Sequence, residues 1–296
     1  MTAVTPSKDH TGENFPVASV LIARRHRPVV MAFYRVARMA DDIADQPRGD
    51  PAAQLAALDA IEATLKGETD AVPEAVALRQ ALAERGQTNA HILDLLTAFR
   101  RDVTQSRYAD WDELMDYCLH SAAPVGRFML ETHGESAALW PASDALCSAL
   151  QIINHLQDCG KDYRQIDRVY LPRDALDAAG VEVSALGASQ ASPALRKVIA
   201  DLAARTATLL AAARRLGPAV GDWGLALEIG VIQRLAESLN RRLLHRDPLS
   251  QRVHHSGVEA LSLAILSIGA FGVSRLGLGA AAKLGHKDAT QRGAQS

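Results

Sequence analysis

Aromatic residues make up only 4% of this 296-residue sequence, and runs of β-branched residues are scarce. Alanine and leucine, which favour helices, dominate instead, so the composition excludes a β-rich domain and predicts an all-α fold. With 48% hydrophobic residues, the chain can bury a large core. It has no internal repeat, low-complexity segment or evident linker, which predicts a single helical domain over residues 13–256.

The sequence also lacks an excess of positive charge, since its net charge is −2. Binding to nucleic acid phosphates needs a basic face, so nucleic acid is excluded as a partner. The three cysteines, Cys118, Cys147 and Cys159, show no CxxC spacing, and reduced thiols in a cytoplasmic protein are the expected state. Residues 1–12 are polar and lack the apolar segment of a signal peptide, and we expect them to be disordered.

No hydrophobic run is long enough to span a bilayer, but the tail at residues 257–296 contains a short one. Ala260–Ser274 is apolar or small throughout, and Arg275, Lys283 and Lys287 follow it. Two interpretations are open. The run is either a last core helix or an interfacial helix that brings the protein into peripheral contact with a membrane.

The most informative stretch is Val29–Asp45, whose apolar residues recur at steps of three and four and so predict a helix. Tyr34, Arg38, Asp41 and Asp45 lie at steps of four, three and four and share one face of that helix. The two carboxylates are separated by about 6 Å of axial rise. Like charges at this spacing destabilise a helix unless something neutralises them.

A second polar stripe lies far away in the sequence, on a predicted helix that includes Leu150–Tyr163. Gln151, Asn154, Asp158 and Asp162 follow one another at steps of three, four and four. One such stripe alone is usually a solvated helix face, whereas two of matching spacing in apolar helices indicate a site. Beyond this helix, residues 164–193 are predicted to form a long irregular loop that could act as a lid.

Two acidic stripes that face each other across a helical core would form a cage for divalent cations. Mg²⁺ accepts one or two carboxylates, keeps several waters and takes further oxygens from a substrate phosphate. The pattern therefore predicts Asp41, Asp45, Asp158 and Asp162 as ligands of Mg²⁺, with a diphosphate between them.

The segments DDIAD and QIINHLQDCGKD resemble the two aspartate motifs of the squalene and phytoene synthase family. ENFPVAS at residues 13–19 and RVYLP at residues 168–172 are similar to further blocks of that family, and the resemblance extends from about Glu13 to about Ser256. It implies an isoprenoid-synthase-type helical bundle around a central cavity. The residues expected to bind the prenyl diphosphate are Ser19, Tyr34, Arg38, Gln151, Asn154 and Arg252.

Three further residues resemble family positions near the reacting carbons. The ring face of Tyr108 or Tyr117 could stabilise a carbocation by about 2 kcal/mol when desolvated, and both are candidate catalytic residues. The alternative is that either tyrosine is an ordinary core ring. Asp102 is either a wall of the same cavity or a surface carboxylate.

Two departures from the family pattern bear on the substrate. Gln157 stands where members that condense two prenyl diphosphates often have arginine, and Lys161 stands where they often have an acidic residue. Arginine can bind a phosphate through two parallel hydrogen bonds, and glutamine cannot. The pattern therefore favours a site that holds one diphosphate.

The resemblance then implies a lyase that converts presqualene diphosphate and water into hydroxysqualene, in the hopanoid pathway. A presqualene diphosphate synthase would supply its substrate, and a flavin-dependent reductase would consume its product. The alternatives are head-to-head condensation of two prenyl diphosphates and a catalytically inactive assembly factor.

Overall fold

The computed structural model describes residues 21–46, 49–256, 259 and 262–263. Within them the chain forms helices and no strand, with one isolated bridge between Arg107 and Val169, so the all-α prediction is confirmed. Ser19, the polar N-terminus at residues 1–12 and the run Ala260–Ser274 fall wholly or largely outside the described part. In the described part, no helix is both long and apolar enough to cross a bilayer.

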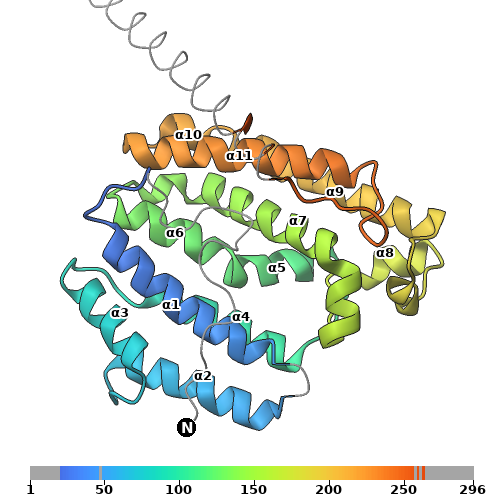
Figure 1. Ribbon diagram of the computed structural model, residues 1–296. Helices are drawn as coiled ribbons and strands as arrows, with labels where there is room; N and C mark the ends of the chain where they lie inside the picture. The colour runs from blue at the N-terminus through green and yellow to red at the C-terminus, as the bar shows by residue number, and fades with distance from the viewer. Residues whose placement is uncertain (1–20, 47–48, 257–258, 260–261, 264–296) are drawn as a thin grey trace, which may run out of the picture.

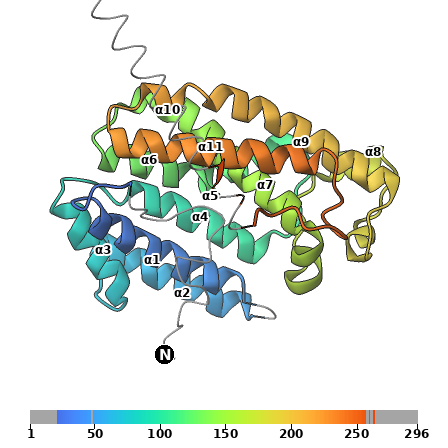
Figure 2. The ribbon, with the colours of Figure 1, turned by 45° about the horizontal axis from the view of Figure 1, so that its top comes forward.

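The helices are α1 (Arg27–Ala44), α2 (Pro51–Lys66), α3 (Pro73–Ala83), α4 (Ala90–Thr104), α5 (Trp111–Ser121), α6 (Ala123–Thr132), α7 (Trp140–Ile166), α8 (Arg173–Ala178), α9 (Pro193–Ala213), α10 (Leu216–Ala219) and α11 (Trp223–Leu243). The described residues also contain two short 3₁₀ helices, η2 (Ala137–Leu139) and η3 (Val183–Gly187). Figures 1 and 2 show α2 and α3 on one side of the bundle, α9 and α11 on the other, and the remaining long helices between them.

Local sequence signals set several helix ends. A proline stands in the first turn of α1, where its missing N–H costs nothing. Gly67 ends α2 in the left-handed conformation, with a φ of 81°. Asp110 caps α5, since its carboxylate accepts a hydrogen bond of 2.9 Å from the Glu113 backbone N–H.

The stretch at residues 164–193 is more regular than predicted. Helix α7 continues to Ile166 and ends at Asp167, whose φ is 51°, and the stretch then contains α8 and η3. Leu176 and Leu186 are buried, and this packing explains why a segment with proline and several glycines is ordered into short helices.

The core consists of two clusters of buried side chains. One is built by α1 to α4, and the other mainly by α5, α7, α9 and α11. Phe128 of α6 joins the first cluster by stacking on Phe33, with ring centroids 4.0 Å apart and planes at 9°. The two clusters therefore face each other along α1, α6 and α7, where the cavity lies.

Candidate active site

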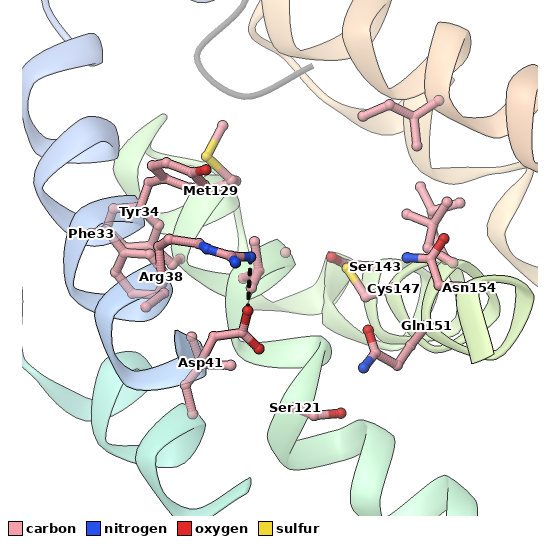
Figure 3. Close-up of a pocket in the computed structure, with 18 of the residues that line it drawn as sticks. Phe33, Tyr34, Arg38, Asp41, Ser121, Met129, Ser143, Cys147, Gln151 and Asn154 are labelled. Carbon is pink, nitrogen blue, oxygen red and sulfur yellow. Dashed lines mark hydrogen bonds and ion pairs between the residues drawn. The ribbon is translucent and has the colours of Figure 1, made fainter. Parts of the chain in front are cut away.

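A cavity of about 550 Å³ lies between α1 and α4 on one side and α5, α6, α7 and α11 on the other. Most of its lining is apolar, and its carboxylates include Asp41, Asp45, Asp102 and Asp162. Figure 3 shows Tyr34, Arg38 and Asp41 of α1 across the cavity from Gln151 and Asn154 of α7. The predicted site residues that line it are Tyr34, Arg38, Asp41, Asp45, Tyr117, Gln151, Asn154 and Asp162.

The two polar stripes thus meet, as the helical spacing predicts. Burial raises the pKa of Asp41, and the nearby Asp45 carboxylate raises it further. Burial raises the pKa of Asp162 to about 7, with contributions from Asp158 on its own helix and from Asp45 on α1. Carboxylates of both helices therefore repel one another across the cavity.

Arg38 balances only part of this negative charge. Its guanidinium donates to Asp41 Oδ2 at 2.9 Å and to Asp42 Oδ1 at 2.6 Å. A hard divalent cation takes carboxylate oxygens as ligands and would relieve the remaining repulsion. The donor set of Asp41, Asp45 and Asp162 therefore fits Mg²⁺.

Asp158, the fourth predicted ligand, does not line the cavity. Its side chain is half-buried, with Lys161 Nζ at 3.8 Å and His254 Nε2 at 3.9 Å. The end of the cavity where Asp41, Asp45 and Asp162 lie is called the acidic end below. Asp158 is one helical turn from Asp162, so it stands at the rim of the acidic end. Its role as a metal ligand stays a prediction.

Arg168 is the main residue of the site to which sequence reasoning gave no role, although its segment RVYLP resembles a family block. Its buried guanidinium donates to Asp45 Oδ1 at 2.7 Å and to the Asp102 backbone carbonyl at 3.0 Å. A further bond reaches the Ala44 carbonyl at 3.3 Å. Arg168 therefore ties the ends of α1 and α4 to the segment after α7.

Asp102 is buried and lines the cavity, so the alternative that it is a surface carboxylate is wrong. It accepts hydrogen bonds from the Tyr117 hydroxyl at 2.8 Å and from the Tyr170 hydroxyl at 3.2 Å. Burial raises the pKa of Asp102 to about 6, against the opposing effect of Arg168.

An aromatic cluster surrounds this carboxylate. Tyr108, Tyr117 and Tyr170 have ring centroids 5.1 to 5.6 Å apart, and the His155 ring stacks on Tyr170 at 3.4 Å. Tyr117, Tyr170 and His155 line the cavity, whereas Tyr108 is buried behind them. Tyr117 therefore faces the cavity, whereas Tyr108 is separated from it by the other rings, and the catalytic roles of both stay predictions.

Gln157 is buried and does not line the cavity. Neither its amide nitrogen nor its amide oxygen has a hydrogen-bond partner within the described residues. On α7 it lies about 60° from Asn154 and about 20° from Leu150, and both of these residues line the cavity. Gln157 is therefore close to the cavity lining without being part of it, and its bearing on a site for one or two diphosphates stays a prediction.

Arg252 also differs from the prediction. It is exposed and does not line the cavity, and its backbone carbonyl accepts a bond from Arg246. Its predicted role in binding the diphosphate stays a prediction.

Outside the cavity, His26, His133 and Asp222 offer ligand atoms within 4.8 Å of one another. Arg25 Nε lies 2.9 Å from one ring nitrogen of His26, and Arg85 Nη2 lies 2.6 Å from the other. Because guanidinium groups only donate hydrogen bonds, a cation here would have to displace two positive groups. We assign no metal to this cluster.

The fold and the cavity together define a helical class of enzyme with acidic side chains at one end of an apolar chamber. Residues 8–259 match the squalene/phytoene synthase family, and the chain belongs to that family.

Among individual relatives, the chain is 57% identical to the hydroxysqualene synthase of Rhodopseudomonas palustris, over 89% of each chain. It is 51% identical to the hydroxysqualene synthase of Zymomonas mobilis, over 90% of each chain. A solved structure of squalene synthase HpnC from Alicyclobacillus acidocaldarius superposes with a TM-score of 0.68 at 32% identity, covering 77% of this chain and 86% of that chain. A dehydrosqualene synthase with a TM-score of 0.74 and 21% identity shares the fold.

Proposed function

We propose that this protein converts presqualene diphosphate and water into hydroxysqualene and diphosphate. The observation that carries the proposal is a chamber whose one end gathers carboxylates from two facing helices while the rest is apolar. The names of relatives that are 51% and 57% identical support the same reaction.

The two ends of the chamber match the two ends of such a substrate. The diphosphate would lie between Asp41 and Asp45 on α1 and Asp162 on α7, with Asp158 at the rim. Mg²⁺ bound by these carboxylates would neutralise the diphosphate and make it a better leaving group. The hydrocarbon would lie against apolar residues such as Phe33, Leu146 and Ile232, which line the remainder of the cavity.

The protein groups around the reacting carbons hold the substrate and protect the cation. Arg38 and Asn154 present hydrogen-bond donors at the diphosphate end. The Tyr117 ring is fixed because its hydroxyl donates to Asp102, so it can stabilise a carbocation that forms beside it. Apolar walls exclude bulk water, so the cation survives long enough to rearrange before one water captures it.

Product analysis after incubation with purified presqualene diphosphate and Mg²⁺, without a reductant, tests this function. The proposal expects hydroxysqualene as the main product and no product from farnesyl diphosphate alone. Turnover of farnesyl diphosphate alone would instead assign the chain to head-to-head condensation.

A further inference from the structure

The cavity contains a buried hydroxyl that the mechanism above does not use. Ser121, the last residue of α5, lines the cavity, and its Oγ is buried without a hydrogen-bond partner in the described part of the chain. A buried hydroxyl that makes no bond is costly, so its presence indicates a partner outside the described residues, such as a bound ligand. The Ser143 hydroxyl differs, because it lies beside the Cys147 thiol and is not among the buried polar groups that lack a partner in the described residues.

The packing of α5 and α6 against α7 places Ser121 opposite Gln151. The Tyr117 and His155 rings are 6.1 Å apart, and a Cβ on Gly126 would lie only 2.6 Å from Cys147 Sγ. Ser121 lies between these two contacts, at the end of α5, and Gln151 lies between them on α7. Figure 3 shows both side chains directed toward the same space.

Together these two side chains offer the contacts that one water molecule needs. The Ser121 hydroxyl can donate and accept, and so can the Gln151 amide. An ordered buried water requires two to four polar partners and a space large enough to hold it. Farther along the cavity, Ser143 lies beside Cys147, whereas the Ser121 hydroxyl has no partner within the described residues.

We propose that Ser121, with Gln151 opposite it, holds the water molecule that captures the carbocation. This inference rests on the proposed function. The bond between carbon and the diphosphate oxygen breaks, and both electrons leave with the diphosphate. A lone pair of the held water then forms the new carbon–oxygen bond, and the extra proton on that oxygen passes to the departed diphosphate. Nothing is oxidised or reduced, and the products are an alcohol and protonated diphosphate.

Ser121 is thereby a water-positioning residue, and its removal should change which product forms more than how fast the diphosphate leaves. In Ser121→Ala, diphosphate release should stay within about threefold of the parent, because ionisation depends on the acidic end. The fraction of product that is hydroxysqualene should fall by about tenfold, since a misplaced nucleophile loses most of its advantage. Hydrocarbons formed by proton loss, or alcohols with oxygen at another carbon, should replace it.

The experiment quantifies released diphosphate and all prenyl products from presqualene diphosphate and Mg²⁺. Ser121→Thr keeps the hydroxyl and should keep the alcohol. Ser143→Ala removes a different hydroxyl of the cavity lining and should keep the alcohol too. Ser121→Gly provides a second hydroxyl-free variant if Ser121→Ala melts early. Folded hydroxyl-free variants that still make hydroxysqualene in the parent proportion, or that stop releasing diphosphate, would overturn the proposal. Failure of the proposed function is distinct, because the parent protein itself would then yield no hydroxysqualene.

Discussion

Arg168 Nη1 lies 2.7 Å from Asp45 Oδ1, and this ion pair joins two segments that are 123 residues apart in the chain. The same guanidinium bonds to backbone carbonyls at the ends of α1 and α4. It is buried, whereas the Asp45 side chain is 43% exposed. Arg168 therefore fixes Asp45 at the acidic end and leaves one side of that carboxylate accessible to a ligand.

Replacing Arg168 should destabilise the protein strongly. Arg168→Gln leaves the buried Asp102 carboxylate without its compensating charge, and we expect a loss of about 3 kcal/mol in the free energy of unfolding. Urea denaturation measures the loss. Arg173→Gln is the matched control, because Arg173 is exposed and, within the described residues, forms its ion pair with the exposed Asp177 at 3.7 Å. Adding Asp102→Asn to Arg168→Gln should recover part of the stability. Equal losses of stability in Arg168→Gln and Arg173→Gln would contradict this role of Arg168.

Asp41→Asn should raise the stability of the metal-free protein and lower its enzymatic activity. It removes a carboxylate that is repelled by Asp45, so the metal-free protein at pH 8 should gain about 1 kcal/mol. This figure is small because the Asp41 side chain is 37% exposed and its charge is partly screened. Turnover with Mg²⁺ should fall about a hundredfold or more. Thermal melts in a chelator test the predicted stability, and initial rates test the predicted turnover. The exposed Asp177→Asn is the control and should change neither quantity.

Gln157→Leu should stabilise the protein without changing the affinity for inorganic diphosphate. It removes a buried amide that makes no hydrogen bond within the described residues, and relief of that cost should be worth about 1–2 kcal/mol. Gln233→Leu is the matched control, because Gln233 is also buried but its amide donates to the Leu210 carbonyl at 2.9 Å. Calorimetric titration with diphosphate completes the test. A weakened titration in Gln157→Leu would place this side chain at the substrate after all.

His155 should make stability sensitive to acid. Burial and the nearby Arg168 lower the pKa of His155 from 6.5 to about 3, and the rings of Tyr170 and Tyr117 pack around it. A histidine with a lowered pKa contributes stability that is complete above pH 6.5 and is lost as the pH falls toward 3. Between pH 7 and pH 4.5 this loss should reach about 2–3 kcal/mol.

His155→Phe keeps a stacking ring and removes the titration, so its stability should fall less than that of the parent over the same range. The exposed His245→Phe should keep the parent's pH dependence. Urea denaturation at both pH values measures the difference, and identical slopes for parent and His155→Phe would contradict the assignment of a neutral buried imidazole.

Sequence periodicity predicted the parts of the site that lie on regular helices. Asp41 and Asp45 share one face of α1, and Gln151, Asn154 and Asp162 share one face of α7, because residues three and four apart align on any helix. Proline and glycine likewise marked helix ends at Gly67 and Pro73. The short helices within residues 164–193 were harder to predict, because burial of Leu176 and Leu186 against the core orders this segment. The local sequence does not show that packing.

Residues whose role depends on distant contacts could not be predicted in the same way. Arg168 acts through Asp45 and two carbonyls from other helices, and sequence spacing does not encode these contacts. Gln157 is buried beside the cavity lining without being part of it, and its position in the motif did not show that its amide would lack a hydrogen-bond partner within the described residues. Ser121 has no motif, and only its burial opposite Gln151 distinguishes it from other serines.

The most direct test of the account is the origin of the oxygen in the product. The purified protein is incubated with presqualene diphosphate and Mg²⁺ in water enriched in the heavy oxygen isotope, with no reductant present, and the products are analysed by mass spectrometry. The account predicts hydroxysqualene that carries the heavy isotope in its hydroxyl group. Hydroxysqualene with the ordinary isotope, or a hydrocarbon as the main product, would contradict capture of the cation by water in this cavity.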